Sequence, residues 1–245
     1  MVDSFNDNSR AIIIGASGGI GTALVAHLAK SDCFCEIHAL SRSGKVFDSG
    51  KVTSHRFDLT REHDLESESR NLKETGDFDL VVVAAGFLHS GTLGPEKNLR
   101  ALSFEGFKTN FAINTIGPAM GAKYFLPLLG RESKSVFAAL SARVGSISDN
   151  RLGGWYAYRA SKAALNMVIK TLSIETARRS AYPIVIGLHP GTVDTPLSEP
   201  FQGHVAESKL FTPEYSAGKL LDVIDRVKPE RNGELIAWDN ETVPF

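Results

Sequence analysis

A tyrosine and a lysine stand four residues apart in the segment from Trp155 to Asn166, which is rich in helix formers. On an α-helix, residues i and i+4 share a face, so Tyr158 and Lys162 can project towards one site. A phenol has a reference pKa of about 10 and is a poor proton donor at neutral pH. A nearby ammonium group favours the phenolate and lowers that pKa. The pair therefore predicts an acid–base site, although the spacing also suits an amphipathic helix with a half-buried Tyr158 and a solvated Lys162.

A glycine-rich turn follows the apolar run at residues 11–14 and precedes a helical stretch. A strand, a glycine-rich turn and a helix in this order are typical of dinucleotide binding. Gly15 permits the tight turn, Gly19 lets the backbone approach a pyrophosphate, and Gly21 allows close packing of helix on strand. The helix N-terminus then offers free N–H groups and its positive dipole end to the phosphates. The expected contacts in this turn are Gly15, Ser17, Gly19, Ile20 and Gly21.

The residues after the second expected strand, 36–40, bear on which dinucleotide binds. An acidic residue about 20 positions past the glycine turn would bind the ribose 2′-OH of NAD, whereas an arginine suits the 2′-phosphate of NADP. The chain has Ser41 and Arg42 at this point and no carboxylate. Arginine holds phosphate with a planar fork, and serine adds a hydroxyl donor. We therefore expect NADP in preference to NAD, against the alternative of an exposed loop arginine.

Two further strand ends provide candidate cofactor contacts. Residues 56–60 are typical of a third strand, in which Asp58 would meet the adenine amino group beside Leu59. Capping of a helix that begins near Arg61 is the competing interpretation of Asp58. Residues 78–83 are an unbroken apolar fourth strand, and small residues follow it where the chain can pass close to a ribose and nicotinamide. These small residues are Ala84, Ala85 and Gly86.

The long helical pattern at residues 103–129 contains Asn114 in its interior. Asparagine and glycine are poor helix formers, and Pro118 would kink the helix by removing a hydrogen bond. A disturbed helix with an inward asparagine can hold a water molecule whose other partner is Lys162. The alternative is an incidental asparagine beside a packing kink.

The fifth and sixth expected strands, 135–140 and 183–188, end in polar and turn-forming residues. Open α/β sheets bind ligands at the carboxyl ends of their strands. Ser141 and Ser146 follow the fifth strand. The expected cofactor contacts after the sixth strand are Pro190, Gly191, Val193 and Thr195.

Residues 196–212 have little periodic pattern and several turn formers, as expected of a substrate lid. Their apolar side chains suggest an apolar substrate wall, although surface loops show the same mixture. These side chains belong to Leu197, Phe201, Val205, Leu210 and Phe211. A last helix at 213–227 and a strand at 234–238 complete the expected fold, a doubly wound (Rossmann) parallel α/β sheet of about seven strands with helices on both faces.

Composition excludes several classes of protein. The 245 residues, 42% of them hydrophobic, suit one domain spanning 1–245 with a sizeable core. A net charge of -1 gives no reason to expect nucleic acid or a membrane surface as partner. Cys33 and Cys35 lack a second pair for zinc, so we expect no metal site and two buried or half-buried thiols. No apolar run approaches the ~18 residues of a membrane span, and we expect a cytoplasmic protein.

These motifs in this order resemble the short-chain dehydrogenase/reductase family, over about residues 11–240. Within it, the stretch from Gly153 to Lys162 and Gly145-Ser146-Ile147 look most like the C-factor and Sniffer-type carbonyl reductase branch. The resemblance implies an NADP-dependent oxidoreductase that interconverts a carbonyl compound and an alcohol by hydride transfer. It also implies a homodimer or homotetramer.

The resemblance further implies roles for the site residues. Tyr158 would exchange a proton with the substrate oxygen, Lys162 would lower its pKa and hold the nicotinamide ribose, and Asn114 would position a relay water. A serine would bind the substrate oxygen.

The serine position departs from the family pattern, which places that serine three residues before a glycine; here Ala142 stands three before Gly145. Ser141 is the first candidate for the role, Ser146 the second, and no serine the third. This departure, and the resemblance to C-factor, keep open an alternative function as a nucleotide-binding signalling or regulatory protein with weak or no turnover.

Overall fold

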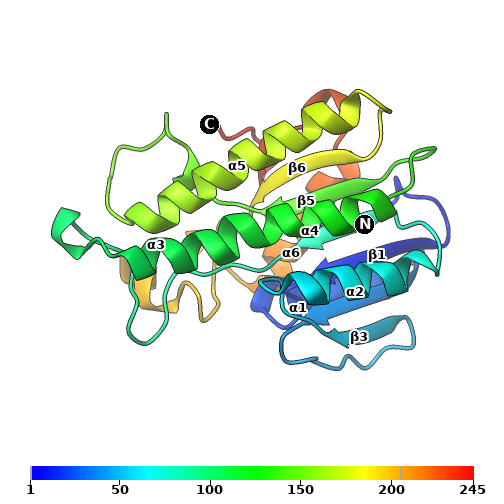
Figure 1. Ribbon diagram of the computed structural model, residues 1–245, viewed down its shortest axis with the longest axis horizontal. Helices are drawn as coiled ribbons and strands as arrows, with labels where there is room; N and C mark the ends of the chain where they lie inside the picture. Colours follow the sequence, from blue (N-terminus) through cyan, green and yellow to red (C-terminus); the bar gives the residue numbers. More distant parts are fainter. Residues whose placement is uncertain (1, 205) are drawn as a thin grey trace.

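Seven parallel strands form the central sheet, in a computed structural model that describes residues 2–204 and 206–245 (Figure 1). In chain order they are β1 Ser9–Ile14, β2 Phe34–Ser41, β3 Val52–Arg56, β4 Leu80–Val83, β5 Val136–Leu140, β6 Ile184–His189 and β9 Leu235–Ala237. Their spatial order is β3-β2-β1-β4-β5-β6-β9, with every neighbouring pair parallel. The chain therefore changes direction across the sheet between β1 and β4, which confirms the predicted doubly wound fold.

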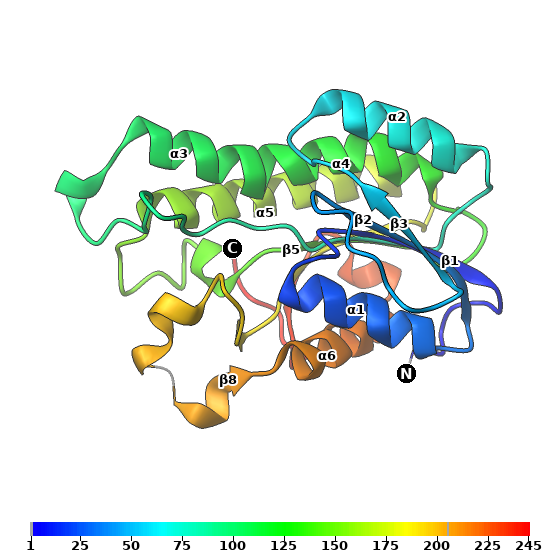
Figure 2. The ribbon, with the colours of Figure 1, turned by 90° about the horizontal axis from the view of Figure 1, so that it is seen from below.

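Helices cover both faces of the sheet (Figure 2). The helices α1 Gly19–Lys30 and α6 Pro213–Arg226 pack together on one face, and α2 Glu62–Lys73, α4 Gly117–Phe125 and α5 Tyr156–Ala177 cover the other. Strand residues alternate between the two cores: Ile13 and Val82 belong to the α1 side, whereas Ile12 and Val81 belong to the α4 side. Strands buried on both faces explain the unbroken apolar runs in the sequence.

The third strand lies four residues earlier in the chain than expected. It runs from Val52 to Arg56, so the predicted strand at residues 56–60 is wrong. The true strand is at the edge of the sheet, and each of its residues is half-buried or exposed, so its apolar signal is weak. Phe57 and Leu59 follow the strand and are buried in the core on the α4 side. Their hydrophobicity, rather than strand pairing, produced the misleading pattern.

The long helical pattern divides into α3 Phe104–Phe111, a π-helical turn at Ala112–Ile116, and α4. The backbone N–H of Gly117 donates to the carbonyl of Ala112, five residues earlier. Pro118 lies in the first turn of α4 and has no N–H to donate to the carbonyl of Asn114. The predicted disturbance of this helix is therefore confirmed, and it takes the form of the wide turn that often marks functional sites.

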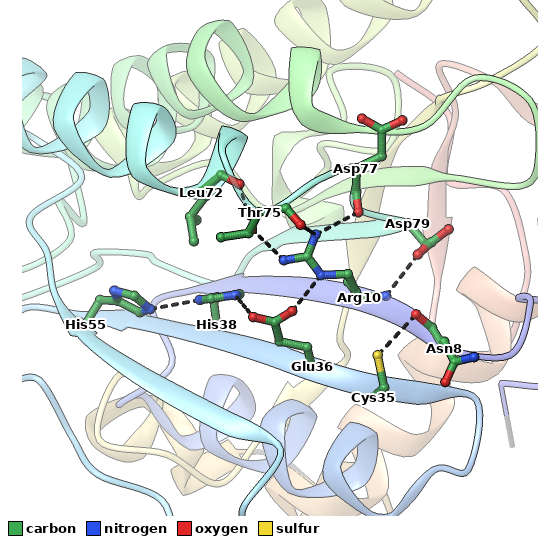
Figure 3. A network of polar contacts seen from close by, with 10 residues as sticks. All are labelled: Asn8, Arg10, Cys35, Glu36, His38, His55, Leu72, Thr75, Asp77 and Asp79. Carbon is green, nitrogen blue, oxygen red and sulfur yellow. Dashed lines mark hydrogen bonds and ion pairs between the residues drawn. The ribbon is translucent and has the colours of Figure 1, made fainter.

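A polar network ties the β1, β2 and β3 edge of the sheet to α2 (Figure 3). Arg10 Nε donates to Glu36 at 2.7 Å, and the other oxygen of Glu36 is 2.8 Å from His38 Nε2. His38 Nδ1 is 2.9 Å from His55 Nε2, and His55 Nδ1 is 2.9 Å from a Glu68 carboxylate oxygen. Burial lowers the pKa of His38, an effect that the neighbouring Glu36 opposes. The protonation of His38 therefore depends on how this edge of the sheet is packed.

The two cysteines differ in exposure. Both thiols are free; Cys33 is half-buried, whereas Cys35 is exposed and its thiol donates to the carbonyl of Asn8. The expectation that both are buried or half-buried is thus wrong for Cys35, because its side chain alternates outwards at the start of β2. No helix in the described part of the chain is long and apolar enough to cross a membrane.

The segment after β6 leaves the sheet as a separate excursion. Its two ends pair as a small parallel ladder, β7 Thr192–Val193 with β8 Leu210–Phe211. Between them lie two 3-10 turns, Glu199–His204 and Glu207–Lys209. Val205, one of the apolar residues expected in the lid, lies outside the described residues. The excursion begins at the carboxyl edge of the sheet, where the site is expected.

Candidate active site

Tyr158 and Lys162 lie one turn apart on the buried face of α5, with 9% and 3% of their surfaces exposed. Lys162 Nζ is 5.8 Å from the centroid of the Tyr158 ring and donates a 2.7 Å hydrogen bond to the carbonyl of Leu140. Leu140 is the last residue of β5. The structure therefore brings both side chains to the carboxyl edge of the sheet, on the shared face that their spacing predicts.

Burial controls the protonation of both groups. It raises the pKa of Tyr158 to about 12 and lowers the pKa of Lys162 to about 7. The expected lowering of the tyrosine pKa by the lysine is not seen here, because Lys162 bonds to Leu140 and itself loses charge on burial. At neutral pH Tyr158 therefore holds its proton, and Lys162 is close to its own titration point.

Asn114 joins the π-helical turn to the loop after β4 and to α5. Its carboxamide oxygen accepts from the backbone N–H of Phe87 at 2.8 Å, and its nitrogen donates to the Phe87 carbonyl at 2.8 Å and to Ser161 Oγ at 3.1 Å. The side chain is fully buried. These bonds use the side-chain amide of Asn114, so a relay water would have to bond to its backbone carbonyl. Pro118, four residues later, has no N–H to donate to that carbonyl.

The candidate serines both have partners away from Tyr158. Ser141 Oγ donates to Asn166 Oδ1 at 2.6 Å, and Asn166 lies eight residues beyond Tyr158, about 12 Å along the helix axis. Ser146 Oγ accepts from the backbone N–H of Asp149 at 3.1 Å, within its own turn. Ala142, at the family's serine position, has extended backbone and faces away from Ser141.

The glycine turn has the shape and donors that a pyrophosphate requires. A Cβ on Gly15 would lie 2.6 Å from the nitrogen of Ala85, and one on Gly21 would lie 2.2 Å from the carbonyl oxygen of Gly15. The first turn of α1 carries no acidic residue, and its N-cap Gly18 provides no side-chain hydrogen bond. Free backbone N–H groups at a helix N-terminus bind anions. These residues therefore fit a dinucleotide, and the turn packs against Ala84, Ala85 and, through Gly19, Thr195.

Cationic and polar groups gather at the ends of β2 and β3. Ser41 is buried, and its hydroxyl accepts from the backbone N–H of Lys45 at 3.3 Å, whereas Arg42 is exposed. Asp58 Oδ1 accepts from the backbone N–H and the hydroxyl of Thr60. Partial burial opposes ionisation of Asp58, but these bonds and the nearby Arg42 outweigh it and lower its pKa. Asp58 thus shapes the turn before α2 while remaining beside Arg42.

The end of β6 completes the edge. Gly191 has a φ of 78°, and a Cβ there would lie 2.6 Å from the Phe211 ring, so only glycine fits. The carbonyl of Pro190 accepts from Ser216 Oγ at 2.8 Å, and Val193 is buried in β7. Thr195 is close enough for its methyl group to lie 2.6 Å from a Cβ built on Gly19. The glycine turn and the segment after β6 therefore meet over the sheet.

Some predicted contacts are oriented away from this edge, and some neighbours were missed. The Leu59 side chain packs against Gly117 of α4, so only the backbone of Leu59 is available to a cofactor. Ser17 is exposed in the glycine turn, and Ile20 is half-buried against the core on the α1 side. Gly86 lies at the surface near Asn114. The sequence interpretation missed Lys45, whose Nζ donates to Thr22 Oγ1 at 3.0 Å beside the glycine turn. A lysine three residues after Arg42 was the available signal.

The sheet order and the strand-end site define a Rossmann-type α/β protein. The family model described as short chain dehydrogenase matches residues 9–205. The chain belongs to the short-chain dehydrogenase/reductase family of oxidoreductases.

Two relatives illustrate the range of this family. The 1-hydroxy-2-glutathionyl-2-methyl-3-butene dehydrogenase of Rhodococcus sp. (strain AD45) is 30% identical over 92% of this chain and 94% of its own length. The C-signal of Myxococcus xanthus is 32% identical over 70% of this chain and 95% of its own length.

Two solved structures share the fold. The NADPH-bound carbonyl reductase from chicken fatty liver has a TM-score of 0.84 at 23% identity, and the carbonyl reductase Sniffer of D. melanogaster has 0.83 at 22%. Each alignment covers 98% of this chain and all of the other. The predicted resemblance to the family and to C-factor is thus confirmed, and the Sniffer structure shares the fold.

Proposed function

We propose that the protein is an NADP-dependent reductase that converts an aldehyde or ketone to an alcohol, with Tyr158 as the proton donor. The observation that carries this proposal is the joint burial of Tyr158 and Lys162 at the carboxyl edge of the sheet, beside an uncapped glycine turn. The buried Tyr158 phenol keeps its proton at neutral pH and can donate it to a substrate oxygen, provided that the negative charge of the resulting phenolate is stabilised.

NADPH supplies the hydride when it is bound. Tyr158 passes its hydroxyl proton to the substrate oxygen. Lys162, in its charged form, stabilises the resulting phenolate and binds the nicotinamide ribose. Because burial holds the pKa of Lys162 at about 7, this stabilisation weakens as the pH rises above neutral. Asn114 holds α5 to the π-helical turn and offers its backbone carbonyl to the water that returns a proton to the lysine.

The preference for NADP rests on charge at the end of β2. Arg42 is exposed directly after β2, and Lys45 Nζ donates to Thr22 Oγ1 beside the glycine turn, so two cationic residues lie near the end of β2, where a 2′-phosphate would bind. Phosphate held by an arginine fork gains charge-assisted hydrogen bonds that a ribose hydroxyl does not supply. The solved carbonyl reductase from chicken fatty liver, which has the same fold, is described as NADPH-bound.

The reaction is tested by following NADPH oxidation with a panel of aldehydes and ketones. We expect turnover with at least one carbonyl compound and a much lower rate with NADH. Tight binding of NADPH without turnover across the panel would overturn the proposal.

A second function is favoured by one specific observation. Ala142 replaces the expected serine, and the hydroxyls of Ser141 and Ser146 bond elsewhere. A protein that binds the nucleotide for signalling, with little turnover, has no need of that hydroxyl. The similarity to the C-signal of Myxococcus xanthus accords with this second candidate. The same panel, combined with calorimetric titration of NADPH, separates the two functions.

We also propose that the protein forms a homodimer or homotetramer in the cytoplasm. On the outer surface of the π-helical turn and α5, the side chains of Ile116, Met167 and Ile174 are 56%, 67% and 50% exposed. Association through this surface would bury them. Light scattering of the purified protein tests the assembly.

A further inference from the structure

An aromatic cluster covers Tyr158. The ring of Trp155 lies 6.1 Å from the Tyr158 ring, nearly edge-on. Phe201, in the segment after β6, packs against Trp155 at 5.1 Å and against the His89 ring at 5.5 Å. We define the aromatic wall as Trp155 and Phe201, supported by His89. It joins three separate parts of the chain directly beside the proposed proton donor.

The segment that carries Phe201 is held to the loop after β4. His89 Nε2 is 3.0 Å from the carbonyl oxygen of Pro196. Leu197 lies 3.9 Å from a Cβ built on Gly86. The wall is therefore supported from the β4 side as well as from α5.

Trp155 occupies a conformation that a bulky residue rarely adopts. Its φ is 52° and its ψ is 43°, in the left-handed region, directly before α5. The backbone N–H of Trp155 donates to the carbonyl of Glu96 at 2.5 Å, and the Glu96 carboxylate accepts from Ala157 N–H at 3.2 Å. Glu96 is itself buried. Strained residues persist where their surroundings over-determine them, and they cluster at functional sites. Here the strained turn directs the indole towards Tyr158.

We propose that Trp155 and Phe201 determine substrate specificity, by packing against a flat apolar group, such as a phenyl ring, attached to the carbonyl carbon. This inference rests on the proposed reductase function. Aromatic rings gain from edge-to-face contacts beyond the area that they bury. An anionic group at the same place would lose its hydration without gaining a partner from the wall. The preferred substrate is therefore an aryl aldehyde or aryl ketone rather than a small aliphatic or anionic one.

The test compares two methyl ketones as substrates with NADPH. Acetophenone carries a phenyl group on the carbonyl carbon where butanone carries an ethyl group. We expect the ratio of kcat/KM for acetophenone over butanone to fall tenfold or more in Trp155→Gly and in Phe201→Ala. Glycine accepts the left-handed conformation, so Trp155→Gly keeps the turn without the indole. Phe104→Ala, at a side chain that is 98% exposed, is the matched control and should leave the ratio unchanged. Equal losses for both ketones in the wall variants would overturn the proposal.

A binding measurement separates failure of the wall from failure of the reductase function. The chain has two tryptophans, so Trp238→Phe leaves Trp155 as the single one. Each ketone is titrated in the presence of NADP⁺, which has no hydride to transfer, and binding is followed by the fluorescence of Trp155. We expect the protein to bind acetophenone at least tenfold more tightly than butanone. Phe201→Ala in this background should remove the difference. Equal affinities in the parent would contradict the wall, whereas discrimination without any turnover would contradict only the reductase function.

Discussion

The Ser141 hydroxyl donates a 2.6 Å hydrogen bond to Asn166, two helical turns beyond Tyr158. This bond ties the end of β5 to α5, and Asn166 in turn lies 3.4 Å from the carbonyl of Gly145. Among the three alternatives that the sequence leaves open, the bond favours a structural part for Ser141 over contact with substrate.

Ser141→Ala should therefore reduce stability more than turnover. The buried oxygen of Asn166 would lose its donor, at a cost of about 1–3 kcal/mol in the free energy of unfolding. We expect kcat within a few-fold of the wild type, because the Ser141 hydroxyl is engaged by Asn166. Urea denaturation and steady-state kinetics check both parts, with Ser146→Ala measured alongside. A hundredfold loss of kcat in Ser141→Ala would return this serine to the catalytic set.

Ala142→Ser should increase turnover. The substitution restores a hydroxyl at the position where the family usually has one, on the opposite side of the extended chain from Ser141. One well-placed donor to a developing oxyanion is worth roughly 10²-fold or more in turnover. We expect a gain of about tenfold, since the surrounding loop has not been shaped for the hydroxyl. An unchanged or lower kcat would show that the site stabilises the substrate oxygen in another way.

Arg42→Ala should weaken NADPH selectively. Loss of a charge-assisted hydrogen bond costs about 1.5–3 kcal/mol, which corresponds to about a tenfold rise or more in KM for NADPH. KM for NADH should change little, because it has no 2′-phosphate. Arg70→Ala serves as the control, since Arg70 is an exposed residue of α2 paired with Glu66. An equal effect on both cofactors would exclude the assigned role of Arg42.

Acidification should destabilise the fold through two histidines. Burial lowers the pKa of His189 from 6.5 to about 4, and burial also lowers that of His38. The unfolded chain therefore binds these protons first as the pH falls. Stability is retained above about pH 6.5 and, through His189, is lost down to about pH 4 at up to about 1.4 kcal/mol per pH unit, while His38 adds a loss of the same sign.

Thermal denaturation between pH 7 and pH 4 measures this loss. His189→Phe should reduce the steepness of the decline, because one titrating group is removed. His63→Gln, at a side chain that is 90% exposed, should leave it unchanged. The same steepness in His189→Phe and the wild type would contradict the assignment to His189.

Much of the fold follows from the sequence because its signals are local. The apolar runs of β1 and β4 and the glycine turn between β1 and α1 predict their elements without tertiary information. The edge strand β3 was misplaced because its residues are polar and the apolar Phe57 and Leu59 pack after it ends.

In the candidate active site too, local features follow from the sequence, whereas features that depend on tertiary contacts do not. The i, i+4 spacing places Tyr158 and Lys162 together, but the effect of burial on their pKa values depends on tertiary packing. The bond from Ser141 to Asn166 and the contact of Phe201 with Trp155 join distant segments, and no local pattern contains them.

The most direct test of the central claim is turnover by Tyr158→Phe, measured as NADPH oxidation with the best carbonyl substrate of the panel. The variant keeps the ring and its contact with Trp155 but has no proton to donate. Proton delivery by a positioned group contributes roughly 10²–10⁴-fold, so kcat should fall by at least about a hundredfold while the Kd for NADPH stays the same. A Tyr158→Phe variant that turns over at the wild-type rate would contradict the assignment of Tyr158 as the proton donor.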